Sequence, residues 1–205
     1  EYTARYRGFE SRPLRLNHSF PGGFFLYNQI MKKHRKMLSN WQARPIEGLM
    51  RLIETQSKET LANWAVDYAE AHFLPIYTKQ YPQDERPLLA VEYARKWLKK
   101  EVKLPEAKKY ILGCHNAAGE AEANPAAQAA ARAIGQAASS IHSATHSLGL
   151  ALYGGLAIAY DQSGMDKPWS EHEAFALKEC EKMLAALQAV AIENEPNPAK
   201  VKWFC

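Results

Sequence analysis

Hydrophobic residues recur along most of this chain at spacings of three and four, which is the period of an α-helix. One such stripe follows Ser57, a residue type that is favourable as the N-cap of a helix. Comparable stripes occupy residues 88–98, 110–118 and 175–190, the last of them after the expected N-cap Ser170. No alternating run of four or more residues indicates a strand. The pattern therefore predicts an all-α fold.

The segment from Ala133 to Tyr160 contains no Lys, Arg, Asp or Glu. A helix that is apolar on every side is either buried or spans a membrane. Only about 13 of these residues, 147–159, are free of strongly polar groups, whereas a membrane span needs about 20. We therefore predict a helical bundle, without membrane contact, packed around one long Ala-rich central helix. This helix starts at Asn124-Pro125, and the pair Gly154-Gly155 is the expected position of any break.

Turn-forming residues and charge divide the chain into three predicted parts: a basic N-terminal arm with short helices (1–56), a helical bundle domain (57–195) and a C-terminal tail (196–205). Residues 1–58 contain 11 Lys and Arg against 4 Asp and Glu, whereas residues 59–205 contain 15 against 18. The net positive charge thus belongs to the N-terminal third. It indicates a surface for nucleic acid or an acidic partner, or else simply a solvated basic face.

Cysteine usage indicates a reducing compartment. The three cysteines, Cys114, Cys180 and Cys205, have unrelated spacings and form no Cys-x-x-Cys motif. No disulfide framework can be argued from this pattern. We therefore expect a cytoplasmic protein.

Two histidines of the charge-poor segment, His142 and His146, are four residues apart and would share one face of a helix. With His115 from the preceding helix they form a candidate metal site. The nearest further ligands in sequence are Cys114, Glu120 and Glu122. The alternative is that the histidines are hydrogen-bonded inside a core of small residues. Because neither His-Glu-x-x-His nor Glu-x-x-His motifs support a metal site here, we expect no cofactor, and a metal ion stays the lesser hypothesis.

Charged residues inside otherwise apolar helices are expected to be paired, because an unpaired buried charge is costly. Arg95 and Arg132 are of this kind, with Asp84, Glu92 or Asp67 as partners. Asp84 also precedes the helix stripe of residues 88–98 as a good N-cap. The candidate binding or polar-network residues are therefore Asp67, Asp84, Arg86, Glu92, Arg95 and Arg132.

Catalytic signatures do not stand out in the sequence. Asp67 and Glu70 are three residues apart, but such pairs on one helix are common by chance. A nucleophile elbow or a phosphate-binding glycine loop would have to follow a strand, and no strand is predicted. We assign no catalytic residue and do not expect an enzyme.

Several short motifs follow one another between about residues 60 and 160. They are Leu61-Ala-Asn-Trp64-Ala-Val-Asp67-Tyr-Ala-Glu70, Leu74-Pro75-Ile-Tyr77, Pro82-x-Asp84-x-Arg86-Pro87, Ala90-x-x-x-Ala94-Arg95-x-Trp97, His115-x-Ala-Ala, Ala129-Ala-Ala-Arg132-Ala-Ile-Gly135-Gln136 and His142-x-x-x-His146-Ser. Together they resemble a bacterial family of immunity proteins of polymorphic-toxin systems. The resemblance implies a small all-α cytoplasmic protein that protects its producer by binding a cognate protein toxin. It supplies no catalytic residues.

Three functions thus remain in competition. The leading hypothesis is toxin neutralisation by direct binding. The second is a nucleic-acid-binding helical domain that uses the basic N-terminal third, which predicts affinity that falls steeply with salt. The third is a metal-binding bundle protein that uses the three histidines. A homo-oligomer is a further hypothesis, with part of the charge-poor helix as a dimer seam.

Overall fold

The computed structural model describes residues 34–203, and every regular element in this part of the chain is a helix. The elements are α2 (Arg44–Ile53), α3 (Lys58–His72), α4 (Leu74–Gln80), α5 (Arg86–Leu98), α6 (Leu104–Glu120), the 3-10 helix η1 (Ala121–Ala123), α7 (Pro125–Ser139), α8 (His146–Ser163) and α9 (Trp169–Val190). The predicted all-α bundle is confirmed. Most of the predicted basic arm lies outside the described residues, and the predicted division into three parts stays a prediction.

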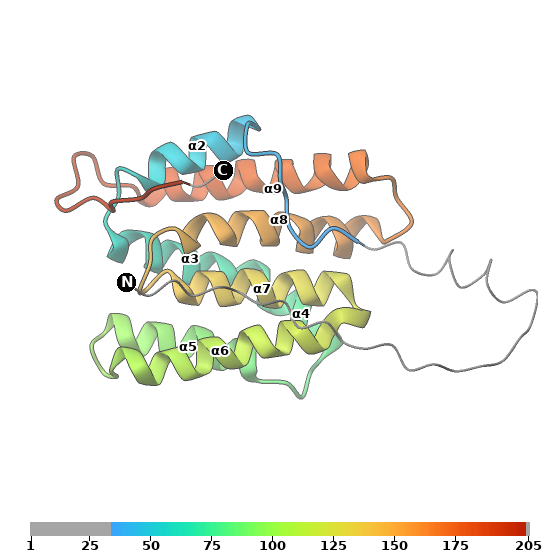
Figure 1. Ribbon diagram of the computed structural model, residues 1–205, viewed down its shortest axis with the longest axis horizontal. Coiled ribbons are helices and arrows are strands. Elements are labelled where there is room, and N and C mark those ends of the chain that lie inside the picture. The colour runs from blue at the N-terminus through green and yellow to red at the C-terminus, as the bar shows by residue number, and fades with distance from the viewer. Residues whose placement is uncertain (1–33, 204–205) are drawn as a thin grey trace, which may run out of the picture. The chain divides into compact units, whose positions relative to one another are not determined.

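The Ala-rich segment forms two helices rather than the single long one that was predicted. The chain turns back between α7 and α8 at residues 140–145, so the two helices lie antiparallel and side by side (Figure 1). The hydroxyl groups of Ser139 and Ser140 donate to the carbonyl oxygens of Gly135 and Ala137. Such bonds from side chains to nearby carbonyl oxygens compete with the backbone hydrogen bonds of the helix and favour the end of α7 here. The expected break at the glycine pair is wrong.

Gly154 and Gly155 continue α8 because they let two neighbours approach closely. A Cβ atom on Gly154 would lie 2.3 Å from the Phe73 ring, which is fully buried. A Cβ atom on Gly155 would lie 2.8 Å from the carbonyl oxygen of Ala176 in α9. The two glycines therefore set the packing distance of α8 rather than its length.

The helices stack in layers, with α2 and α9 at the top of Figure 1, α8 below them, then α3 and α7, and α5 with α6 at the bottom. Helix α7 contacts α3, α4, α5, α6 and α8, and α8 packs between α7 and α9. Most side chains of α7 and α8 are buried, and most of those on α7 are alanines. The charge-poor segment is thus covered by other helices of the same chain, as predicted. No helix within residues 34–203 is both long enough and apolar enough to cross a membrane.

Two of the four predicted helix starts carry the expected cap. The Ser57 hydroxyl accepts the amide N–H of Thr60, and the Asn124 side chain accepts that of Ala127. Helix α5 begins at Arg86, two residues after Asp84, whose carboxylate still accepts the Arg86 amide N–H at 3.1 Å. The predicted cap at Ser170 is wrong. Helix α9 begins at Trp169, after Pro168, whose carbonyl oxygen accepts hydrogen bonds from the amide N–H groups of Glu171 and His172.

Candidate functional site

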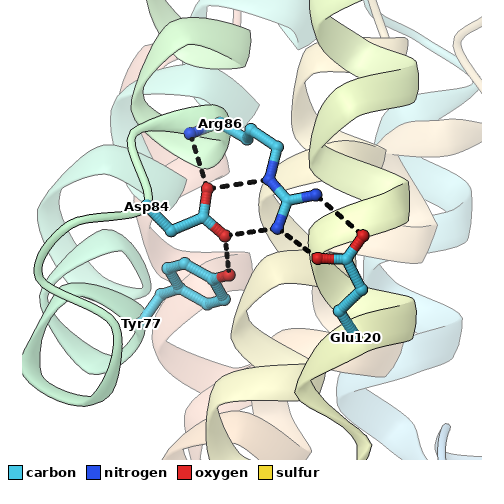
Figure 2. Close-up of polar contacts among 4 residues, drawn as sticks. All are labelled: Tyr77, Asp84, Arg86 and Glu120. Carbon is cyan, nitrogen blue, oxygen red and sulfur yellow. Dashed lines mark hydrogen bonds and ion pairs between the residues drawn. The ribbon is translucent and has the colours of Figure 1, made fainter.

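A network of four polar side chains, those of Tyr77, Asp84, Arg86 and Glu120, is centred on the guanidinium group of Arg86 (Figure 2). Arg86 donates to both carboxylate oxygens of Asp84, at 2.8 Å from Nε and 2.7 Å from Nη2. On its other side it donates to Glu120, at 3.0 Å from Nη1 and 2.6 Å from Nη2. The Tyr77 hydroxyl donates to Asp84 at 2.6 Å. The network thereby ties α4, the start of α5 and the end of α6 together.

Charge complementarity explains why these groups converge. The bonds from Arg86, and then that from Tyr77, lower the pKa of Asp84 to about 2, against the opposing effect of burial. Glu120 lies at the carboxyl end of α6, where a negative charge is unfavourable to the helix dipole. Arg86 offsets this and lowers the pKa of Glu120. The site is therefore held ionised at neutral pH, and two of the predicted network residues, Asp84 and Arg86, are brought together.

Replacing Asp84 with asparagine is expected to lower the free energy of unfolding by about 1–2 kcal/mol at pH 7. The Asp84 side chain is only 18% exposed and pairs with Arg86. The neutral amide of asparagine would keep the size of the side chain but lose the negative charge that binds the guanidinium group. Because the folded pKa of Asp84 is depressed, this stabilisation is complete above the ordinary pKa of 3.8 and disappears as the pH falls through about 2. Urea unfolding of both proteins between pH 2 and 7 measures the difference. A difference that does not shrink on acidification would contradict this assignment.

A second network joins α3 to α5. Arg95 donates to Asp67 at 2.7 Å and also contacts the carboxylate of Glu70. The predicted pairing of Arg95 with Asp67 is confirmed. The same guanidinium group binds the carboxylates of both Asp67 and Glu70. Glu92, which was predicted to belong to the same set, is exposed, and its side chain forms no ion pair or hydrogen bond with another residue in 34–203.

The three histidines and Arg132 lie around the turn that separates α7 from α8. The rings of His142 and His146 are 5.2 Å apart, and His146 Nδ1 lies 2.7 Å from the side-chain oxygen of Gln136. The His115 ring packs against Gly135, so closely that a Cβ atom there would lie 2.6 Å from it. Arg132 Nε and His142 Nδ1 are buried without a hydrogen-bond partner among the described residues. No ion pair joins Arg132 to Asp84, Glu92 or Asp67, so the pairing that was predicted for Arg132 is wrong.

Burial is the main cause of the lowered pKa values of these histidines. Burial lowers the pKa of His115, and the charges of Arg132 and His146 lower it further. Burial lowers the pKa of His142 to about 4, with smaller effects from His146, Lys108 and Lys58. Burial also lowers the pKa of His146. The histidines are therefore neutral at pH 7.

The further metal ligands that the sequence suggested do not reach the histidines. The Cys114 thiol is buried and lies 3.1 Å from the carbonyl oxygen of Ala131, Glu120 is bound by Arg86, and Glu122 pairs with Lys36. Among residues 34–203, no three His, Cys, Asp or Glu side chains are grouped so that they could hold a metal ion. The metal hypothesis stays a prediction.

A pocket that the sequence did not indicate opens between the start of α3 and the end of α5. It has a volume of about 310 Å³ and is lined by Lys58, Glu59, Trp97, Leu98, Lys100 and Val102. Its lining combines aromatic and aliphatic groups with charges of both signs. This combination is typical of protein-binding surfaces, where tryptophan side chains often contribute most of the affinity.

Comparison with known families gives one match. The family described as "Imm-5 like putative immunity protein" matches residues 51–197, which run from the last turn of α2 to beyond the end of α9. Searches of curated proteins and of solved structures find no match.

Proposed function

The chain belongs to the Imm-5 like immunity protein family, and from this premise we propose that it neutralises a cognate toxin protein by binding it directly. The observation that carries the proposal is the extent of the match, which covers the helices from α3 to α9 rather than one motif. An immunity protein of this kind acts by occlusion. Its surface must therefore be complementary to the toxin.

The arrangement of the helices suits such a role. Ion pairs of Arg86 and Arg95 join α3, α5 and α6 in the unbound chain, so we expect a surface on these helices to be preformed before binding. A rigid surface loses little conformational entropy when a partner docks. Less of the interaction energy is then lost to ordering the surface, so the affinity for the partner is higher.

The buried thiols are poor candidates for catalysis. Burial raises the pKa of Cys114, and burial together with Glu179 and Glu181 raises that of Cys180 to about 12. Nucleophilic cysteine chemistry requires the thiolate, so both groups stay unreactive at neutral pH. We expect the protein to act in the cytoplasm of the bacterium that produces the toxin, where such thiols stay reduced.

Co-expression with a candidate toxin from a neighbouring gene tests the proposal. We expect the full chain to restore growth to cells that produce the toxin, and to co-purify with a catalytically inactivated toxin. A folded and soluble chain that gives neither growth nor a complex would overturn the proposal. Circular dichroism of the purified chain checks that it is folded in the assay.

A further inference from the structure

One end of the bundle concentrates positive charge. Residues 96–109, which comprise the end of α5, the connection and the start of α6, contain six lysines and two glutamates. Residues 59–205 as a whole carry a net charge of −3, so the net charge of this cluster is opposite in sign to that of the region that contains it. None of the six lysines, nor Lys58, forms an ion pair within the described part of the chain. Arg86 and Arg95, by contrast, are each bound by two carboxylates.

These lysines come from three helices and one connection, and the parts of the chain that carry them meet at one end of the bundle, where Lys58 and Lys100 line the same pocket. The charges of Lys58 on α3 and Lys108 on α6 both act on His142 in the turn between α7 and α8. Figure 1 shows the start of α3, the connection between α5 and α6, and this turn at the same end of the bundle, on the left. We call the surface made by Lys58 and residues 96–109 the basic end.

The pocket beside Trp97 opens within the basic end. Trp97, Leu98 and Val102 give it apolar walls, and Lys58, Glu59 and Lys100 supply the charges around them. Protein interfaces commonly have such an arrangement, with an apolar centre surrounded by a polar rim.

The backbone at Lys100 gives a second, independent observation. Lys100 has φ = 62°, in the left-handed region that favours glycine. Its amide donates to the carbonyl oxygen of Trp97 and that of Glu101 to Lys96, both at 2.8 Å, which is the Schellman ending of a helix. Glycine is the favoured residue at this position, and a lysine there is strained. Lys100 therefore places a charged side chain at the rim of the pocket, at a position where glycine would make the folded state more stable.

We propose that the basic end is the surface on which the toxin docks, through an acidic face of the toxin and an apolar side chain that enters the pocket beside Trp97. This inference rests on the proposed function and names the chemistry of the partner. Charge complementarity would steer the encounter and fix its orientation. Glu59, Glu101 and Glu106 lie among the lysines, which suits a protein surface of mixed charge better than the uniform phosphates of a nucleic acid.

The test compares two double charge reversals in the full chain, with inactivated toxin as the ligand. Lys100→Glu with Lys103→Glu alters the basic end. Arg44→Glu with Lys178→Glu makes the same charge change at the start of α2 and on α9, in the opposite outer layer of the bundle. We expect the first variant to bind the toxin at least ~30-fold more weakly, mainly through slower association, and the second to change by less than ~3-fold.

Each outcome decides a different point. If the wild-type chain does not bind the toxin, the proposed function fails, and this inference fails with it. If it binds and both variants bind equally well, only the docking surface is wrong. A third result, in which a 20-base-pair duplex binds at low salt and only the first variant loses that binding while keeping the toxin, would assign the basic end to nucleic acid instead.

Lys100→Gly separates a role in binding from a role in folding. Because glycine relieves the left-handed strain, we expect the melting temperature to rise by about 2–4 °C. Because the rim charge is lost, we expect toxin binding to weaken by roughly fivefold. A variant that is more stable and binds as tightly as the wild type would show that Lys100 does not contact the toxin.

Discussion

Gly155→Val is expected to lower the free energy of unfolding by about 3 kcal/mol or more. A Cβ atom at this position would lie 2.8 Å from the Ala176 carbonyl oxygen, a backbone atom of α9. A side chain could rotate away from such a contact, but a helix backbone cannot. Helices α8 and α9 would therefore have to separate, and the buried residues between them would lose their packing.

Urea unfolding followed by circular dichroism measures this effect. Gly119→Ala is the matched control, because α6 contains this glycine and no atom lies within 4 Å of the added Cβ position. Alanine is the better helix former, so the control is expected to gain about 0.5–1 kcal/mol. A Gly155→Val protein as stable as the wild type would show that α8 and α9 do not pack this closely.

Arg86→Met is expected to lower the free energy of unfolding by about 2 kcal/mol, between the values typical of exposed and buried ion pairs. The Arg86 side chain is 36% exposed, whereas that of Asp84 is only 18% exposed. Removal of the guanidinium leaves the Asp84 carboxylate with Tyr77 as its side-chain partner and leaves Glu120 without one. The start of α5 and the end of α6 would then lose their common anchor.

Lys79→Met is the control for this loss. It removes a cation of similar length, but the Lys79 side chain is 63% exposed and pairs with Asp161 at 3.3 Å across a solvated surface. The expected change is within about 0.5 kcal/mol. Equal losses in the two variants would mean that the network around Arg86 adds nothing beyond an ordinary surface ion pair.

Local chemistry made part of this fold predictable from the sequence. Ser57 and Asn124 cap helices as expected, because a cap depends on residues only three positions away. The pairing of Arg95 with Asp67 was predictable because an arginine in an apolar helix needs a partner. Burial of the charge-poor segment followed from its composition alone.

Features that depend on packing could not be predicted in this way. The pattern favoured a break at Gly154, but the neighbouring helices use that position for close contact and the chain turns at residues 140–145 instead. Glu179 pairs with Lys182, three residues further on, at 2.8 Å. Glu179 is nevertheless only 2% exposed, on the buried stripe of α9, where it also accepts a hydrogen bond from the Tyr68 hydroxyl of another helix at 2.7 Å. Sequence spacing does not reveal such a partner.

The basic end was missed for a different reason. The net charge of residues 59–205 is −3, because the acidic residues outside 96–109 conceal the six lysines within that segment. A shorter window would have shown the cluster. The pocket beside Trp97 would still have been hidden, since it forms only when Lys58 and Glu59 of α3 meet the end of α5.

Hydrogen exchange of the full chain, alone and bound to the inactivated toxin, is the most direct test of whether the toxin docks on the basic end. The toxin is predicted to slow exchange in residues 96–109 and at the start of α3, and to leave the exchange of α2 and α9 unchanged. Slower exchange confined to α2 and α9, or no change anywhere at saturating toxin, would contradict this prediction.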